Sequence, residues 1–561
     1  MRGKLTLLAG VCAGAIAFPA YAQDAGEEKN STDIVVTAQR SAEKLQDVPI
    51  AVSAFSAESL DKQQIKNTSD LQLSLPNVTF TKTNFTSASF TIRGIGDLCV
   101  GLTCDSATAI HMNDAPLFGT RIFEGEFYDL AQVEVLRGPQ GTLFGRNATS
   151  GVVNIRTARP SFSGLAASAE AEYGNYDSVK VKGMVNVPLG DIAAIRVAGY
   201  YLNRDGYTLN TFTNTRQDNR DMYGLRGSLR VEPSSSTTID LMVQYFHESD
   251  NRMRAQKLMC QRDPTGILGC LNGERAYDVP NGNATLAAIL TSREFLSAKL
   301  GATIGSALGL GSLYGNDYYV GESNPADPRV VHSDFTPTYF TKEWNVQGSI
   351  EQDLGGGLKF KLGGNYQKVE LESQQDYNSL VVQRGGFATG LGSLSAAAAG
   401  AFNGVAPGLS NYLGPIAAAL IPSGASGALC TSQPEETLTG IYGGHKICTN
   451  TPLDFDRSDQ YQSSWSAEAI LSSDWDGPVN FLLGGIYSKF HLTENSYYIN
   501  SFGLDYATGL LGAMTAYGNK TISSGAIVAA PFPVTAGQSY FLASPFYRNN
   551  SDDLKINSYG I

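Results

Sequence analysis

The residues best suited to chemistry in this sequence are its cysteines, and their spacing favours disulfide bonds. Of the seven present, Cys12 lies in an apolar N-terminal run. The other six form three local pairs: Cys99 with Cys104, Cys260 with Cys270, and Cys430 with Cys448. Pairs this close become disulfides in an exported chain. Zinc binding is the alternative, but the spacings are not those of zinc sites and the five histidines are scattered, so we predict no metal site.

A glycine-rich segment, Gly138 to Gly145, invites comparison with phosphate-binding loops. A Walker loop continues with Lys and then Ser or Thr, whereas Arg146 and Asn147 follow here. We therefore expect these glycines to permit tight turns inside a packed domain. The sequence also offers no Ser/His/Asp set at useful spacing. It predicts no catalytic residues, no cofactor and no enzyme.

The first 22 residues have the pattern of a secretory signal peptide. Arg2 and Lys4 form a positive start, an apolar run extends to Phe18, and Ala20-Tyr21-Ala22 is a small-x-small cleavage site. The apolar run is too short to span a bilayer comfortably. The net charge of −12 gives no broad electrostatic reason to bind nucleic acid. We predict an exported protein with no nucleic-acid partner.

Residues 41–160 mix helical and strand patterns and predict a small α+β domain. Helical spacing occurs over residues 56–66, with Ser56 as N-cap, and again over residues 68–75. Short strand-like runs cover residues 90–93, 109–112, 133–136 and 152–155. Arg93 and Arg137 adjoin two of these apolar runs. If their side chains are buried, they need anionic partners, since an unpaired buried charge is very costly.

After Pro160 the chain changes to long alternating segments. Residues 358–363 are typical, with Leu358, Phe360 and Leu362 on one face and Lys359 and Lys361 on the other. The segments run to about 9 to 13 residues, long enough to cross a bilayer at a tilt. Short turns alternate with very long loops, roughly 249–339, 374–460 and 500–553, an asymmetry typical of outer-membrane barrels.

We therefore predict an all-β membrane protein. About ten barrel strands are recognisable, the last beginning near Leu554, which is too few to enclose a domain of over a hundred residues. The sequence is expected to be truncated within its barrel. A barrel lacking its closing strands would expose an unpaired edge to lipid, so the fragment alone is not expected to insert stably.

Several motifs, in order, resemble those of TonB-dependent outer-membrane receptors. Residues 33–38 (DIVVTA) resemble the TonB box, and residues 47–52 (DVPIAV) resemble the start of the plug. Residues 92–94 (IRG) and 133–146 (VEVLRGPQGTLFGR) resemble its inner strands, and 151–155 (GVVNI) its end. The resemblance implies a signal peptide (1–22), a flexible N-terminus with the box (23–40), a plug (41–160) and the first part of a barrel with long extracellular loops (161–561). The complete barrel would have about 22 strands.

The resemblance also implies partners and site residues. The box, comprising Asp33, Ile34, Val35, Val36, Thr37 and Ala38, would add a strand to the C-terminal domain of periplasmic TonB. Plug arginines in this family pair with barrel glutamates, so Arg93 and Arg137 would pair with Glu468 and with a second glutamate beyond Ile561. Outer-membrane lipid would surround the barrel.

Ligand contacts from the plug would involve Asn84, Asp97, Phe118 and Arg121. Ferric siderophores are the family's commonest cargo, and the aromatic residues of the last long loop suit sugars or aromatic compounds as well. A passive porin or surface-binding protein is the alternative from another class. It would need neither the box nor a complete plug.

Overall fold

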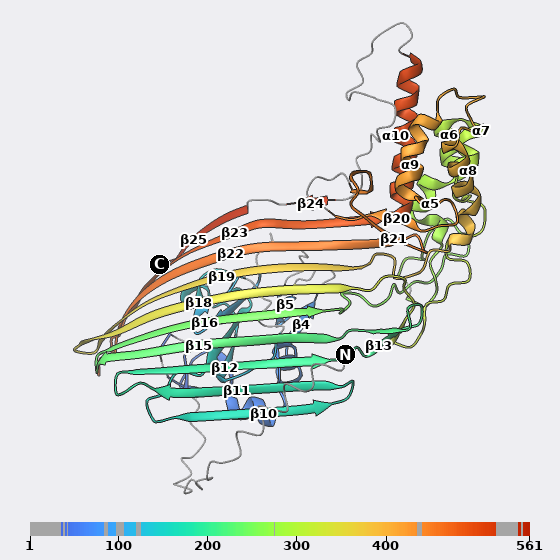
Figure 1. The fold of residues 1–561 in the computed structure, drawn as a ribbon. Helices are drawn as coiled ribbons and strands as arrows, with labels where there is room; N and C mark the ends of the chain where they lie inside the picture. Colours follow the sequence, from blue (N-terminus) through green and yellow to red (C-terminus); the bar gives the residue numbers. More distant parts are fainter. Residues whose placement is uncertain are drawn as a thin grey trace.

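The computed structural model describes residues 35–37, 40–41, 43–82, 88–96, 106–118, 125–273, 275–434, 440–522, 548–550 and 554–560. Within these ranges the chain forms a small N-terminal α+β domain, a large curved antiparallel sheet and a group of helices at one end of that sheet (Figure 1). The predicted combination of a small α+β domain with a large antiparallel sheet is confirmed.

The N-terminal domain is built on a five-stranded sheet in the order β3-β8-β9-β6-β7. Its strands are β3 (Ala51–Ser56), β6 (Thr108–Met112), β7 (Ala115–Pro116), β8 (Leu130–Arg137) and β9 (Gly151–Thr157). A separate hairpin pairs β4 (Val78–Lys82) with β5 (Ala88–Ile92). Central strands β8 and β9 are rich in valine, leucine and isoleucine, and Val133, Val135 and Val153 are fully buried.

Short helices cover this sheet. Helix α2 (Ala57–Lys62) begins where the Ser56 side chain accepts a hydrogen bond from the Ser59 N–H, as the sequence predicts. A 3₁₀ turn, η1 (Thr68–Asp70), is capped by Asn67 and leads into α3 (Leu71–Ser74), while α4 (Gly141–Phe144) follows the glycine-rich turn.

The large sheet follows chain order, from β10 through β11, β12, β15, β16, β18, β19 and β22 to β23, which pairs with both β24 and β25. The strands are β10 (Ala166–Gly174), β11 (Ser178–Pro188), β12 (Ala193–Arg204), β15 (Arg220–Ser234), β16 (Thr237–Asp250), β18 (Thr338–Gly355), β19 (Leu358–Asp376), β22 (Asp454–Ser473), β23 (Leu482–Ser501), β24 (Arg548–Asn550) and β25 (Leu554–Gly560). Several strands extend well beyond the predicted alternating segments.

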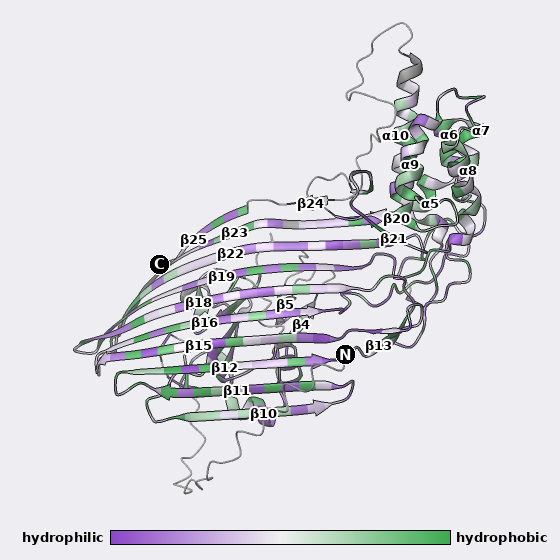
Figure 2. Ribbon diagram, viewed as in Figure 1, coloured by the Kyte–Doolittle hydropathy of each residue, from purple (hydrophilic) through white to green (hydrophobic). Residues whose placement is uncertain are grey.

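Alternation along these strands separates two environments. On β18, Asn345 and Gln347 are buried while Trp344 and Val346 are exposed. The buried polar face lies toward the N-terminal domain, where Gln347 donates to the Met112 carbonyl, whereas the exposed face carries apolar and aromatic side chains. Figure 2 shows hydrophilic and hydrophobic residues interspersed along the strands. Such a polar inside and apolar outside is the pattern of a sheet that meets lipid. Among the described residues, no helix is both long and apolar enough to cross a membrane.

The long connections, which the sequence predicts only as loops, form a helical cap. The cap comprises α5 (Leu286–Thr291), α6 (Arg293–Leu300), α7 (Ala302–Leu308), α8 (Ala388–Ala398), α9 (Ser410–Leu420) and α10 (Phe502–Ile522), gathered at one end of the sheet (Figure 1). It has its own core, in which Leu296, Leu391, Leu413 and Leu510 are essentially inaccessible.

Small sheets and disulfides complete the connections. Strand β13 (Thr208–Asn210) pairs with β14 (Thr215–Gln217) and with β17 (Val330–Val331), and β20 (Leu429–Ser432) pairs with β21 (Lys446–Thr449). The structure joins Cys260 to Cys270 and Cys430 to Cys448.

Candidate functional site at the interface of domain and sheet

The interface between the N-terminal domain and the large sheet is organised around Asp114. Asn113 and Asp114 have φ of 51° and 70° and form the two-residue turn that joins β6 to β7. The turn places the Asp114 carboxylate 3.4 Å from Arg156 and 3.3 Å from Lys361 of β19. Burial alone raises the pKa of this carboxyl, but Arg156, Lys361 and Arg40 outweigh it and hold the pKa well below its usual range. Asp114 is therefore a permanent anion that ties the domain to the sheet.

Arg40 forms the second tie. Its side chain is 2% exposed, and Nη2 lies 3.0 Å from Oε1 of Glu468 on β22. The guanidinium also donates to the backbone oxygens of Leu143 and Asp114, and it lies over the Phe144 ring at 4.6 Å. The planar guanidinium of Arg40 suits this position because it has several N–H donors, and acceptors on three different segments surround it.

Beside Arg40, the segment predicted as a TonB box lies on the domain surface. Strand β1 (Val35–Val36) pairs with β2 (Glu43–Lys44), and Val36 is completely buried. The Thr37 backbone N–H donates to Glu134 at 3.0 Å, its hydroxyl donates to the same carboxylate, and Arg156 donates to that hydroxyl. Burial raises the pKa of Glu134, partly offset by the Thr37 and Arg156 contacts.

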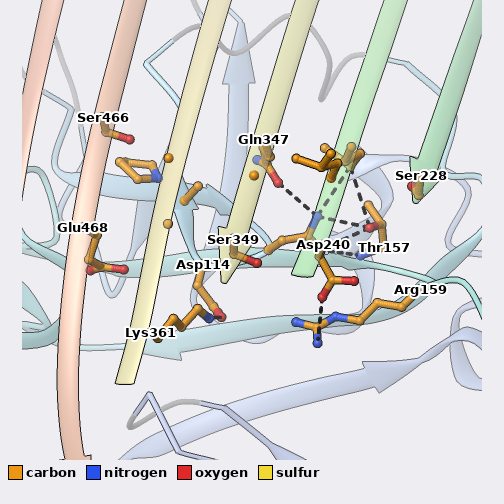
Figure 3. Close-up of a pocket in the computed structure, with 18 of the residues that line it drawn as sticks. Asp114, Thr157, Arg159, Ser228, Asp240, Gln347, Ser349, Lys361, Ser466 and Glu468 are labelled. Carbon is orange, nitrogen blue, oxygen red and sulfur yellow. Dashed lines mark hydrogen bonds and ion pairs between the residues drawn. The ribbon is translucent and has the colours of Figure 1, made fainter. Parts of the chain in front are cut away.

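A cavity adjoins these ties. It has a volume of about 80 Å³ and lies between the turn at Asp114 and the sheet strands β16, β18, β19 and β22. The sheet side is lined partly by glycines and serines, including Gly348, Gly363 and Ser466. Figure 3 shows Lys361 beside Asp114, with Glu468 on the neighbouring strand and Gln347 bonded to the domain. Small side chains on the sheet leave this space unfilled.

Neighbouring contacts across the same interface are isolated polar bridges. The amide of Gln347 donates to the Met112 carbonyl at 3.0 Å, and Asn365 donates to the Pro116 carbonyl at 3.1 Å. The Phe118 backbone N–H donates to Gln367 at 3.0 Å, and its ring lies 6.1 Å from that of Phe490. These bonds hold the domain against β18 and β19 with little apolar packing.

Strands β12, β15 and β16 contact the domain through buried ion pairs and apolar packing. Asp129 accepts hydrogen bonds from Arg196 of β12 and Arg226 of β15, and Arg226 is 2% exposed. Tyr128 and Tyr200 pack with ring centroids 5.0 Å apart. One continuous apolar cluster joins the domain to β12, β15 and β16 through Ala198, Met222 and Phe246. The domain is therefore packed firmly against β12 to β16 and bridged lightly to β18 to β22.

Three of the predicted ion-pair residues need correction. Glu468 is paired with Arg40, not with Arg93 or Arg137. Arg93 is exposed at a positive φ of 55°, beyond the end of β5, and Arg137 donates to the Ser53 hydroxyl at 3.1 Å. The physical reason is position: Arg93 lies just beyond the end of β5 and Arg137 ends β8 against Ser53, whereas Arg40 reaches β22.

Other predicted residues fall outside the described ranges. They are Asp33, Ile34 and Ala38 of the box, the ligand-contact candidates Asn84, Asp97 and Arg121, the cysteines Cys99 and Cys104, and the signal peptide at 1–22. Sequence reasoning missed Arg40, Asp114, Glu134 and Lys361. Only the Asn113-Asp114 pair carried a usable local signal, as a turn between two short strands. Among the described residues, no group of three His, Cys, Asp or Glu side chains could hold a metal ion.

Comparison with known proteins identifies the domain. Residues 44–152 match the family model described as TonB-dependent Receptor Plug Domain. Two strains of Vibrio cholerae each have an "Iron-regulated outer membrane virulence protein" that is 30% identical over 195 residues, covering 33% of this chain and 29% of that protein. This chain thus spans less than a third of the length of the curated relatives it matches.

Solved structures resemble the chain at low identity. The siderophore receptor PiuA from Acinetobacter baumannii has a TM-score of 0.48 at 12% identity, covering 81% of this chain and 47% of that one. The ferripyoverdine receptor of Pseudomonas aeruginosa has a TM-score of 0.49 at 11% identity, covering 84% and 46%.

The N-terminal domain is a plug, and the large sheet is the wall around it. Residues 44–152 thus form a plug domain of the kind found in TonB-dependent receptors.

Proposed function

We propose that this protein is an energy-coupled importer that takes up a scarce nutrient, a ferric siderophore, under the control of TonB. The observation that carries the proposal is the placement of the predicted box segment. Val35 to Thr37 lie directly on the plug and connect through Glu134 and Arg156 to Asp114, which contacts the wall. A pull on this segment would act on the contacts that hold the plug.

The box segment has the properties needed to bind a partner by strand addition. Its pairing with β2 involves only two residues, Val35 opposite Lys44 and Val36 opposite Glu43. The Val35 side chain is half exposed. A short pairing of this kind can be exchanged for a longer one with TonB at small cost, because backbone hydrogen bonds are replaced in kind.

Iron is favoured as the cargo by the name of the Vibrio cholerae relatives, which are iron-regulated outer-membrane proteins. The relatives' name concerns their regulation and location, so the ferric chelate remains our proposal for this chain. In the same way, the predicted ligand contacts at Asn84, Asp97, Phe118 and Arg121 remain proposals.

The test is uptake by cells that express the complete gene, with and without TonB, using ferric siderophores, oligosaccharides and aromatic acids. Val35→Pro should abolish uptake, because proline lacks the N–H that a β ladder requires. Val35→Ala is the matched control, since it shortens the same half-exposed side chain and keeps the N–H. Uptake that is unaffected by Val35→Pro and by loss of TonB would establish a passive channel instead.

A further inference from the structure

The helical cap meets the wall where four sheet strands begin or end, at β18, β19, β22 and β23 (Figure 1). One aspartate lies at each of these crossings. Asp376 ends β19, and Asp454 begins β22. Asp334 lies just before β18, and Asp505 lies in the first turn of α10, which directly follows β23. We call these four residues the aspartate seam.

The carboxylates of the seam are bonded to neutral groups on other segments of the chain. Asp505 is completely buried, and Asp376 is 7% exposed. The donors are hydroxyls and amides: the Ser333 hydroxyl donates to Asp376 at 2.6 Å, the Asn378 side chain to Asp454 at 2.7 Å, and the Ser432 N–H to Asp505 at 2.7 Å. Ser333 and Asp376 belong to different connections, as do Ser432 and Asp505. These bonds therefore tie the cap-forming connections to one another beside the wall.

The seam lacks a positive charge that would balance its carboxylates. Among the residues that the structure describes, none of the four aspartates forms an ion pair, and one carboxylate oxygen of Asp334 has no hydrogen-bond donor. Asp334, Asp376 and Asp454 nevertheless lie near enough to one another to interact electrostatically. Asp250, at the end of β16, shows the contrast, because Arg220 lies 3.1 Å from it. Ionising the seam therefore places like charges in a junction without a cation, which is costly.

Charged groups on the surrounding segments do not neutralise the seam. Between α7 and β18, Glu322 lies near Asp334 and adds another negative charge, while Tyr318 and Tyr319 lie among the aspartates as neutral phenols. The cations of neighbouring segments each have another partner: His332 pairs with Glu322, Arg262 with Asp317, Arg254 with Asp456, and Arg384 with the carbonyls of Asn450 and Ala425.

Asp505 is surrounded by elements with little charge. Helices α5 and α9, strand β20 and the last three residues of β23 contain no charged side chain. The Tyr442 hydroxyl donates to the Asp505 backbone oxygen at 2.9 Å. Helix α6 carries two exposed cations, Arg293 and Lys299, and Glu294, which is bonded to the segment after α7. No cation on the described parts of these elements therefore pairs with Asp505.

Burial favours the protonated form of these acids while the cap is closed. It raises the pKa of Asp505 to about 7, despite the hydrogen bonds from Ser432, and it raises the pKa of Asp334, with Glu322 adding to the effect. When the cap separates from the wall, the carboxyls become hydrated and each pKa returns toward about 4. The closed form thus holds protons that the open form loses between about pH 4 and pH 7. Closure therefore weakens as the pH rises through this range.

We propose that the aspartate seam is a pH-sensitive hinge, which holds the cap against the wall in acid and releases it as the pH rises toward neutrality. The protonated seam is neutral and keeps its bonds to the other segments. The ionised seam repels itself, and separation from the wall hydrates its charges. Because the cap core combines side chains from all three connections, the cap moves as one body. This hinge goes beyond the proposed function, since it depends neither on the cargo nor on TonB.

The test measures access to Leu453, which is 1% exposed in an apolar cluster with Phe335 and Phe455 beside the seam. In cells that lack TonB and express the complete gene, Leu453→Cys provides a buried thiol, and Tyr314→Cys provides an exposed reference thiol. The maleimide alkylation rate at position 453 is divided by that at position 314 at each pH, which removes the intrinsic pH dependence of thiol reactivity. From pH 5 to pH 8 this ratio should rise at least about tenfold, since one unit of pKa difference already changes the opening equilibrium tenfold.

Two variants test whether the seam itself causes the rise. Asp505→Asn and Asp334→Asn each remove one titrating group and keep the shape of the side chain. Each should lower the ratio at pH 8 by at least about threefold, which corresponds to half a pKa unit, and leave the ratio at pH 5 unchanged. Asp327→Asn is the matched control: Asp327 is exposed in the same connection as Asp334, and the amide can still accept from the Arg329 N–H. It should change neither ratio.

The inference is overturned if the ratio stays within about twofold from pH 5 to pH 8. It is also overturned if both seam variants keep the full rise, or if Asp327→Asn lowers the ratio at pH 8 as much as they do. A seam variant that fails to fold is recognised by a raised ratio at pH 5, and the other variant and the parent profile then decide. Because TonB is absent throughout, the hinge and the proposed function can fail separately.

Discussion

The contribution of β12 and β15 to holding the plug can be tested at Asp129. This carboxylate is 8% exposed and accepts from Arg196 at 2.9 Å and from Arg226 at 3.4 Å. Asp129→Asn is a close match in shape, and asparagine tolerates the positive φ of 47° found there. The variant removes one negative charge and leaves two buried guanidiniums facing a neutral amide.

Breaking a buried ion pair by removing one partner costs about 3–5 kcal/mol. The amide oxygen keeps one hydrogen bond, so we expect the lower end of this range, about 3 kcal/mol. Since each 1.4 kcal/mol is a factor of ten, the protection of the plug's backbone amides against hydrogen exchange should fall by roughly a hundredfold. The assay is amide hydrogen exchange of β8 in the detergent-purified receptor, because β8 directly follows Asp129 and is released when the plug opens.

Glu172→Gln provides the matched control, with the same change of acid to amide at another ion pair between the plug and the wall. Glu172 is 46% exposed and pairs with Lys66 and with Lys180, and Lys180 keeps its closer partner Glu126 in the variant. Exposed pairs contribute about 0–1 kcal/mol. The effect of Glu172→Gln on β8 exchange should stay below about fivefold. If Asp129→Asn and Glu172→Gln change exchange equally, the argument that Asp129 anchors the plug is refuted.

Two further predictions concern acid and the cap. Burial, reinforced by Arg40, lowers the pKa of His111 to about 4, so between pH 6.5 and 4 the unfolded chain binds a proton that the folded plug does not. Stability should therefore fall as the pH drops through this window, by up to about 3 kcal/mol from this group. The melting temperature of His111→Gln should fall less from pH 7 to pH 5 than that of the parent; equal falls would contradict this. Replacing Cys430 and Cys448 by serine should cost the cap about 3 kcal/mol, seen as faster proteolysis of residues 377–453 on whole cells. An unchanged rate of proteolysis would show that the apolar core stabilises the cap without the disulfide.

The sequence predicted the wall well because alternation is a local property. Leu358 to Glu370 was recognised as a strand from its own residues, and β19 includes all of it. The remaining part of β19, up to Asp376, follows from pairing with β22 and carries no equally clear local pattern. Strand segments with a clear local alternation were therefore predicted from the sequence. Strand extensions that depend on pairing with another strand were not.

The site was predicted in part for the same reason. Glu468 was predicted from the family resemblance as the wall partner of a plug arginine, and the structure pairs it with Arg40 instead of Arg93 or Arg137. Arg40 lies 428 residues away in sequence, in a segment that read only as a flexible tail. Choosing between Arg40, Arg93 and Arg137 requires the position of each guanidinium relative to the wall, which depends on the packed plug.

The helical cap follows from packing among segments that are individually weak. Helices α5 to α7 are six to eight residues long, shorter than a helix that is stable alone in water. Their core is drawn from three separate connections, with Leu308, Leu391 and Phe502 each contributed by a different one. No single connection can leave this core without exposing the others' apolar side chains. The three connections must therefore move together, and any rearrangement that admits cargo past the cap has to move it as one body or pass beside it.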